Sequence, residues 1–326
     1  MARFHLPLFP GHRPVEAPDW LQNLVLVGTA GADTLTAVST TRLMLGLGGD
    51  DRITAEGRAE GPGVAMFGSA GNDEITVGGS HNLLSGGAGN DTILLTADIG
   101  FSTDSVAFGG AGDDTIFAFG SGNTLFGGSG ADRLGVNGLR VRDNVVHGGA
   151  GNDTLTGNGF NNRLNGGNGD DVLNSSSFGI GVSYTEDDGA FMTGGAGRDT
   201  FNPTNTGLLL VRNDLDGTVS DGDELGGVFN VITDYDAGER IGLGPLLRQE
   251  GPVGLVDPRV GPPDYLTPEI EAGRYAGFRG EFLGSGRFMV EEDGPDLMIV
   301  TADENVSSGR GALVLQGWSG GDPLIA

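Results

Sequence analysis

One nine-residue pattern, Gly-Gly-x-Gly-x-Asp-x-apolar-x, recurs nine times between Gly28 and Asn202. Among its clearest copies are Gly86–Leu94, which reads GGAGNDTIL, and Gly148–Thr156, which reads GGAGNDTLT. A unit this short cannot bury an apolar face by itself, so its copies must stack to form a core. The repeat therefore predicts a solenoid. Glycine, at 63 of 326 residues, is a periodic part of that solenoid rather than the mark of a disordered linker.

The spacing of the motif aspartates predicts the length of one coil. The nine aspartates are Asp33, Asp51, Asp73, Asp91, Asp114, Asp132, Asp153, Asp171 and Asp199. Consecutive ones lie 18, 22, 18, 23, 18, 21, 18 and 28 residues apart. Eighteen residues are two nonapeptides, each a turn followed by a short strand. Every motif aspartate then falls on one edge of the stack, one per coil.

Every second coil carries a longer turn on the opposite edge. These turns are residues 55–67, 95–108, 136–147 and 174–193. Loops that project regularly from one side of a solenoid often bind partners. Tolerated surface insertions would give the same pattern.

The apolar position of each copy predicts an interior ladder. Its members are Leu35, Ile53, Ile75, Ile93, Ile116, Leu134, Leu155, Leu173 and Phe201. A second ladder is expected to face it, formed by Met44, Met66, Leu84, Val146, Leu164 and Met192. Each buried aliphatic side chain contributes about 1.5–3 kcal/mol, whereas each ordered residue costs roughly 1–2 kcal/mol of backbone entropy. A core this thin needs another source of stability.

The opposite edge keeps the apolar residue but loses the acid. Degenerate nonapeptides there place Asn82, Asn123, Asn162 and Arg42 in the aspartate slot. A neutral amide or an arginine cannot replace a carboxylate as a calcium ligand at equal strength. We therefore expect metal on one edge only.

Calcium is the expected ion, because it takes six to eight hard oxygen ligands. Glycine-rich turns expose backbone carbonyls and reach positive φ, and carbonyls from two adjacent turns plus their aspartates make a six-oxygen shell. Nine turns give up to about eight ions in one row. Besides the nine aspartates, the predicted metal-binding residues are Gly28, Gly31, Gly46, Gly49, Gly68, Gly71, Gly86, Gly89, Gly109, Gly112, Gly127, Gly130, Gly148, Gly151, Gly166, Gly169, Gly194 and Gly197.

These repeats resemble those of the RTX (repeats-in-toxin) family, whose haemolysin-type nonapeptides bind calcium in a parallel β-roll. Phe229–Leu243 also resembles the segment that follows the repeats in secreted RTX proteins, with Asp234-Tyr235-Asp236 as its core and Arg240 where an aspartate is common. The resemblance implies a protein that is unfolded in the cell, leaves through the type I secretion machinery by a C-terminal signal, and folds in extracellular calcium.

The expected fold class is all-β: a right-handed parallel β-roll followed by a β-rich C-terminal capping and secretion domain. Residues 1–27 are the expected lead-in, 28–202 the roll and 203–326 the cap. Leu297–Asp303 and Ala312–Gln316 are predicted strands of that cap, since a solenoid end must be covered.

The composition of the chain limits the classes of partner that it can bind. A net charge of −26 argues against nucleic acid and anionic membranes, and all 18 basic residues are arginine. No cysteine is present, so disulfide bonds cannot stabilise the fold, and we expect bound metal to do so. Prolines interrupt the N-terminal stretch where a secretory signal has its apolar run, and no apolar run reaches the length of a membrane span.

Catalytic motifs are weak, and we expect no enzyme. His5, His12, His81 and His147 form no H-E-x-x-H motif. Gly317–Gly321 fits G-x-S-x-G, but no helix follows it. Asn213–Glu224 resembles a calcium-binding EF-hand loop, but Arg212 occupies the first ligand position, which favours a solvated acidic loop.

The leading functional prediction is a secreted calcium-binding protein with a structural or interaction role at the cell surface, in the matrix or at a host interface. Its extracellular partner is open: a glycan, a surface or another copy. A carbohydrate-binding or polysaccharide-modifying role is the alternative, with the acidic Tyr184–Asp188 stretch as its place. Ice binding is a remote alternative, because Arg52, Glu74, Arg133 and Val172 interrupt the outward threonine rows.

Overall fold

The structure is a computed structural model. It describes residues 24–38, 41–55, 63–96, 103–138, 141–177, 189–205, 210–211, 219, 222, 224–236, 239–242, 248–249, 255–256, 267–268, 274–302 and 310–318. Contacts divide the chain into two compact units, Met1–Val136 with Gly148–Ala150, and Asn137–His147 with Gly151–Ala326. The described residues form strands and turns but no helix, and accordingly none of them belongs to a helix that could span a membrane.

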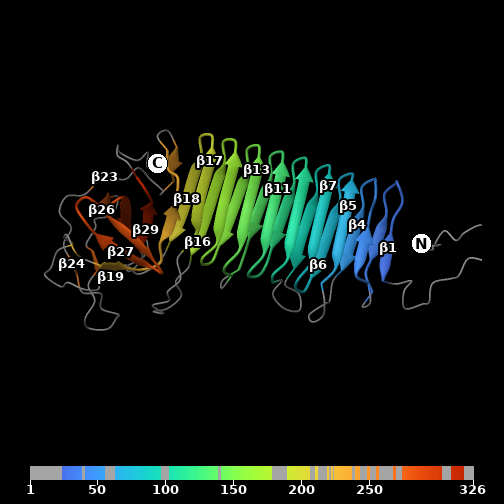
Figure 1. Cartoon of the computed structure of the whole chain (residues 1–326), viewed down its shortest axis with the longest axis horizontal. Coiled ribbons are helices and arrows are strands. Elements are labelled where there is room, and N and C mark those ends of the chain that lie inside the picture. Colours follow the sequence, from blue (N-terminus) through green and yellow to red (C-terminus); the bar gives the residue numbers. More distant parts are fainter. Residues whose placement is uncertain are drawn as a thin grey trace, which may run out of the picture. The chain divides into compact units, whose positions relative to one another are not determined.

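The first unit is a parallel solenoid, whose coils follow one another from blue to green in Figure 1. Each coil contributes one strand to each of two sheets. One sheet contains β1 (Val25–Val27), β3 (Leu43–Leu45), β5 (Ala65–Ala70), β7 (Leu83–Ala88), β9 (Val106–Ala111) and β11 (Thr124–Ser129). The other contains β2 (Thr34–Thr36), β4 (Arg52–Ala55), β6 (Glu74–Gly78), β8 (Thr92–Thr96), β10 (Thr115–Ala118) and β12 (Arg133–Val136).

The second unit begins with further coils of the same kind. One set of strands comprises β13 (Val145–Ala150, whose last three residues belong to the first unit), β15 (Arg163–Asn168), β17 (Phe191–Ala196) and β21 (Asn230–Ile232). The other comprises β14 (Thr154–Asn158), β16 (Val172–Ser177), β18 (Thr200–Asn205) and β22 (Arg240–Ile241). The pairings within this unit are again parallel.

An antiparallel sheet continues from the last coil of the second unit. Its main strands are β20 (Glu224–Gly226), β26 (Arg274–Gly284), β27 (Arg287–Val290), β28 (Asp296–Ala302) and β29 (Arg310–Leu315). Two further strands of this sheet are two residues long, β19 (Leu210–Val211) and β23 (Arg248–Gln249). The strands β24 (Leu255–Val256) and β25 (Thr267–Pro268) pair with each other in a separate two-stranded sheet. Strand β29 pairs in parallel with β21, so this sheet is hydrogen-bonded to the coil. Its buried cluster includes Phe229, Phe288, Met298 and Val314.

The interior ladders follow the predicted register. Ile53, Ile75, Ile93, Ile116 and Leu134 are aligned on neighbouring strands and are at most 1% exposed. The facing residues Met44, Met66, Leu84, Val146, Leu164 and Met192 are equally buried. Leu35 differs from its counterparts, because it is only half-buried in the first described coil, where β2 has one strand neighbour, β4. The all-β parallel solenoid is thus confirmed.

Parts of the four longer opposite turns, and all of Tyr184–Asp188, lie outside the described residues. The stretches that are not described are 56–62, 97–102, 139–140 and 178–188, whereas the rest of each turn, including 141–147, is described. The proposed domain boundaries at residues 28 and 202 stay predictions.

Candidate metal centre

The motif aspartates form a hydrogen-bonded ladder along one edge of each unit. The backbone N–H of each donates to Oδ1 of the aspartate in the next coil. In the first unit the bonds run from Asp33 to Asp51, Asp73, Asp91, Asp114 and Asp132 at 2.7–2.8 Å. In the second unit they run from Asp153 to Asp171 and Asp199 at 2.8 Å. One carboxylate oxygen per turn therefore fixes the register between coils.

The other carboxylate oxygen of these turns has no protein partner. Oδ2 is buried and accepts no hydrogen bond in Asp51, Asp73, Asp91, Asp114, Asp132, Asp153, Asp171 and Asp199, and these residues are 1–3% exposed. Asp33 is the exception, because the backbone N–H and hydroxyl of Thr29 both donate to its Oδ2. Eight buried oxygens that carry negative charge thus face no donor, an arrangement that is costly unless a cation is bound.

Glycine at the first motif position makes room for this oxygen. A Cβ on Gly46, Gly68 or Gly86 would lie 2.1 Å from Oδ2 of the aspartate in its own turn. The same clash, at 2.3 Å or less, would arise at Gly109, Gly127, Gly166 and Gly194. Any other residue there would fill the space beside the carboxylate. The turn thus preserves a small polar space at each aspartate.

Glycine at the fourth motif position has a different role. From Gly49 to Gly197 these glycines have φ between 91° and 145°, which side chains with a Cβ rarely adopt. The carbonyl oxygen of Gly71 lies 2.1 Å from where a Cβ on Gly89 would be, and that of Gly46 lies 2.5 Å from the corresponding point on Gly28. First-position carbonyls thus point back toward the preceding coil and fourth-position carbonyls point forward, as the six-oxygen shell requires.

The electrostatics of the row favour a bound cation. Burial raises the pKa of Asp114 to about 7 and the pKa of Asp91 and of Asp171 to about 6. The neighbouring aspartates raise these values further, while the ladder hydrogen bonds lower them. Desolvation and like charges both disfavour the ionised form, and a cation beside Oδ2 would reverse both effects.

A calcium ion fits this set of groups. Within the part of the chain that the structure describes, no three acidic or histidine side chains gather as a site of side chains alone. An ion here must therefore draw on backbone carbonyls beside the aspartates, and hard oxygen donors of this kind are what calcium takes. The aspartates would supply the charge and the glycine turns the carbonyls. Which carbonyls bind stays a prediction.

The opposite edge has the same ladder built from neutral side chains. Oδ1 of Asn82 accepts from the N–H of Val64 at 3.1 Å, and Oδ1 of Asn162 accepts from the N–H of Asn144 at 3.1 Å. The remaining amide group is also satisfied, because Nδ2 of Asn82 donates to the carbonyl of Gly79 and Nδ2 of Asn162 to that of Asn158. These asparagine turns close without a cation.

One residue of the row escaped the sequence analysis. Register pairs Arg240 with Thr200 and Ile241 with Phe201, so Glu239 occupies the slot that follows Asp199. Glu239 is 2% exposed, and burial, with Asp199 and Asp234 nearby, raises its pKa to about 8. The signal was Ile241 two residues later, but the 40-residue gap from Asp199 and the missing glycines hid it.

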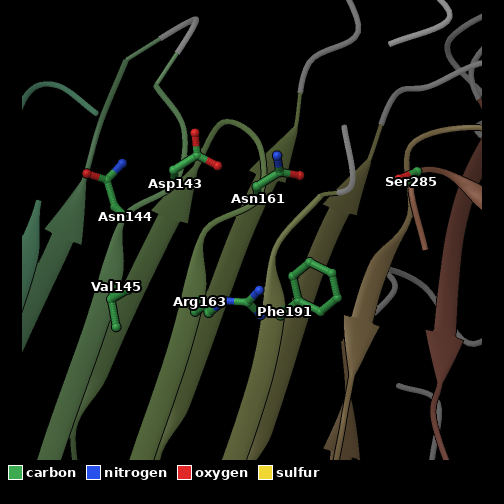
Figure 2. Close-up of a pocket in the computed structure, with 7 residues that line it drawn as sticks. All are labelled: Asp143, Asn144, Val145, Asn161, Arg163, Phe191 and Ser285. Atoms are coloured by element: carbon green, nitrogen blue, oxygen red, sulfur yellow. The ribbon is translucent and has the colours of Figure 1, made fainter. Parts of the chain in front are cut away.

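A separate pocket of about 300 Å³ lies on the second unit. Figure 2 shows its lining residues, Asp143, Asn144, Val145, Asn161, Arg163, Phe191 and Ser285. The guanidinium carbon of Arg163 lies 4.9 Å from the ring centroid of Phe191. Among the described residues, neither Asp143 nor Arg163 makes an ion pair. The pocket thus offers an acceptor, a donor fork and an apolar surface.

Comparison with known proteins agrees with this geometry. The family described as RTX calcium-binding nonapeptide repeat (4 copies) matches residues 66–95, 99–134 and 143–178. No curated protein matches the chain. The matched repeats bind calcium in that family, and they coincide with coils whose aspartate oxygens lack a partner. The repeats and the parallel solenoid together identify the chain as an RTX β-roll protein.

Proposed function

We propose that this protein is secreted, and that calcium makes it fold once it has left the cell. The observation that carries the proposal is the row of eight buried aspartate Oδ2 atoms without a donor. In the absence of a cation this row opposes folding, because each carboxylate must be dehydrated or protonated. Extracellular calcium removes that opposition, whereas the low calcium of the cytosol leaves it in place.

The free energy of calcium binding is large enough to change the chain from unfolded to folded. A site with a dissociation constant near ~0.1 mM contributes about 1.4 kcal/mol in ~1 mM calcium. Eight sites of this affinity would contribute roughly 11 kcal/mol, which is comparable with the whole stability of a domain. At cytosolic calcium the same sites contribute almost nothing.

A calcium titration followed by circular dichroism tests the folding step. The β-sheet signal should rise cooperatively in the sub-millimolar to millimolar range and disappear on chelation. Magnesium at equal concentration is the control, since it dehydrates reluctantly and demands octahedral geometry. A fully folded protein in excess chelator would contradict the proposal.

The proposed export route is the type I secretion machinery. Proteins with RTX repeats are typically exported, and by analogy with that family we propose that the export signal lies near the C-terminus. Deleting Gly309–Ala326 should trap the protein in the cytosol, whereas deleting Met1–Trp20 should not. Normal secretion of the C-terminal deletion would exclude this route.

For the role outside the cell, we propose a structural or interaction function without catalysis. The groups with the largest raised pKa values among the described residues are the aspartates of the row and Glu239, and the repeat itself accounts for them. Incubation with polysaccharides, peptides and esters should give no turnover above background. The binding partner is proposed to be a surface component, a glycan or another copy.

A carbohydrate-binding role is the second candidate, because of the pocket in Figure 2. Asp143 can accept hydrogen bonds from hydroxyl groups, and Arg163, held over Phe191, can donate to a sugar oxygen or carboxylate. A glycan array probed in calcium tests it, with Arg163→Ala as the variant that should lose binding. Binding that is unchanged in this variant would place the glycan site elsewhere.

A further inference from the structure

The outer face of one sheet in the first unit carries no charge. Strands β1, β3, β5, β7, β9 and β11 each direct two residues outward, in two registered rows. We call these twelve residues the apolar face: Val25, Leu43, Ala65, Leu83, Val106 and Thr124 in one row, and Val27, Leu45, Phe67, Ser85, Phe108 and Phe126 in the other. Ten of the twelve are apolar.

The other sheet of the same coils shows that this composition is not a general property of the solenoid surface. Its outward rows contain six threonines and three charged residues, Arg52, Glu74 and Arg133. The whole chain has a net charge of −26. On the apolar face, Leu83 is 42% exposed and Phe108 is 39% exposed. An uncharged apolar surface on so acidic a protein indicates a contact with a partner.

The geometry of the aromatic rings narrows the kind of partner. The rings of Phe108 and Phe126 are stacked, with centroids 4.9 Å apart and planes 6° from parallel. This separation is close to the spacing between strands, so each ring faces its neighbour along the stack and presents its edge outward. Sugars that bind by stacking need an exposed ring face. Ring edges and aliphatic side chains instead form ridges, which suit another ridged protein surface.

We propose that two copies of this chain associate through their apolar faces, sheet against sheet. A two-fold axis brings identical patches together, and the uncharged face lets two strongly acidic molecules meet without opposing carboxylates. Flat sheets pack face to face at about 10 Å with interdigitating side chains. This association rests on the proposed interaction role and names another copy as the partner, but it requires only a folded solenoid and neither export nor a host partner.

The size of the apolar face predicts a weak dimer. Six strands about 4.8 Å apart and two outward rows about 6.6 Å apart give a strip of about 29 by 13 Å, or about 380 Å². Stable interfaces bury about 800 Å² per partner. The association should therefore be reversible, with a dissociation constant in the micromolar range or above.

Sedimentation in calcium across a range of protein concentrations tests the proposal. The wild-type protein should show a monomer–dimer equilibrium. Leu83→Glu should raise the dimer dissociation constant at least tenfold, because it places a charge in the contact. Thr92→Glu is the matched control: Leu83 and Thr92 are both exposed, on strands β7 and β8 at either side of the Asp91 turn. This variant should dimerise like the wild type.

A single-cysteine experiment locates the contact. The chain contains no cysteine, so Ser85→Cys on the apolar face should form a disulfide between copies under mild oxidation, whereas Thr115→Cys on the other sheet should not. Circular dichroism in calcium shows separately whether each variant has folded. A wild-type protein that is folded yet monomeric up to about 1 mM, or equal losses from Leu83→Glu and Thr92→Glu, would overturn the proposal.

Discussion

The backbone N–H of Asp73 donates to Oδ1 of Asp91 at 2.7 Å, and on the other edge of the same two coils the N–H of Val64 donates to Oδ1 of Asn82 at 3.1 Å. The two bonds have the same place in the turn. The second atom of each side chain makes the difference: Nδ2 of Asn82 donates to the carbonyl of Gly79, whereas Oδ2 of Asp91 has no partner. The asparagine turn has all of its side-chain hydrogen bonds without a metal ion, whereas the aspartate turn needs a cation.

Asp91→Asn should therefore weaken calcium binding at one turn and make that turn more stable in the absence of calcium. The substitution removes a buried carboxylate, and burial raises the pKa of that carboxylate to about 6. The amide nitrogen of asparagine is a hydrogen-bond donor, and it takes the position of Oδ2, which has no partner. Calorimetry should show the loss of up to two calcium ions, since each aspartate lies between two coils. Circular dichroism in excess chelator should show a β-sheet signal for the variant that is equal to or larger than that of the wild-type protein. An unchanged calcium stoichiometry would contradict the assignment of Asp91 as a ligand.

Asn82→Asp is the reverse exchange. The new carboxylate would place an acceptor against the carbonyl of Gly79, in a residue that is 4% exposed. A buried group left without its partner costs about 1–3 kcal/mol, so urea unfolding in calcium should show a loss of about that much stability. Asn82→Ala, which adds no charge, should leave the calcium stoichiometry unchanged. A loss of ions in Asn82→Ala would show that this edge also binds metal.

Gly86→Ala should weaken the metal centre although it replaces none of the aspartates. The new Cβ would lie 2.1 Å from Oδ2 of Asp91, so the carboxylate must move out of the space it now occupies. We expect weaker calcium binding and a lower thermal midpoint in calcium, by several degrees. Gly48→Ala is the control, because its Cβ would meet nothing closer than 3.8 Å. Equal midpoints for the two variants would show that the first-position glycine has no steric role.

The period of the repeat predicts the coils because the same residues recur at each strand and turn. Ile75 and Ile93 occupy equivalent sequence positions and are neighbours in the sheet. The C-terminal sheet has no such period. Two of its strands, β28 and β29, overlap the predicted Leu297–Asp303 and Ala312–Gln316, but the pairing of β28 with β29, and of β29 with β21, depends on distant residues. The bonds of Asn82 depend on atomic positions that no motif encodes.

Acid should have opposite effects on the metal-free and the calcium-bound protein. The pKa of Asp114 is raised to about 7 and that of Asp91 to about 6, from an ordinary value of 3.8. The folded metal-free state thus binds protons more tightly than the unfolded state, so its stability falls as pH rises from about 4 to about 7. With calcium present, protons compete for the same oxygens, and calcium affinity should fall as pH drops through 7.

Circular dichroism and a proton-release measurement at pH 5 and pH 8 check both signs. In buffers freed of metal, the β-sheet signal should be larger at pH 5 than at pH 8. Calcium added to the protein at pH 5 should release protons, because it displaces them from these carboxylate oxygens. A metal-free protein that is more stable at pH 8 would contradict the raised pKa values of the row.

Glu239→Gln should remove one calcium ion from the end of the row while leaving the rest of the calcium-bound fold intact. Glu239 follows Asp199 in register, its Oε2 accepts from the N–H of Asp236 at 2.6 Å, and the charges of Asp199 and Asp234 are near its carboxyl group. With a pKa raised to about 8, the metal-free carboxyl is protonated at pH 7, and a glutamine amide resembles this neutral form. Metal binding instead requires the carboxylate, which glutamine cannot supply. Calorimetry should therefore show one ion fewer, and circular dichroism in calcium should show an unchanged β-sheet signal. Glu281→Gln, at an exposed position of the same unit, should lose no ion, and a Glu239→Gln protein with the full calcium count would show that the row ends at Asp199.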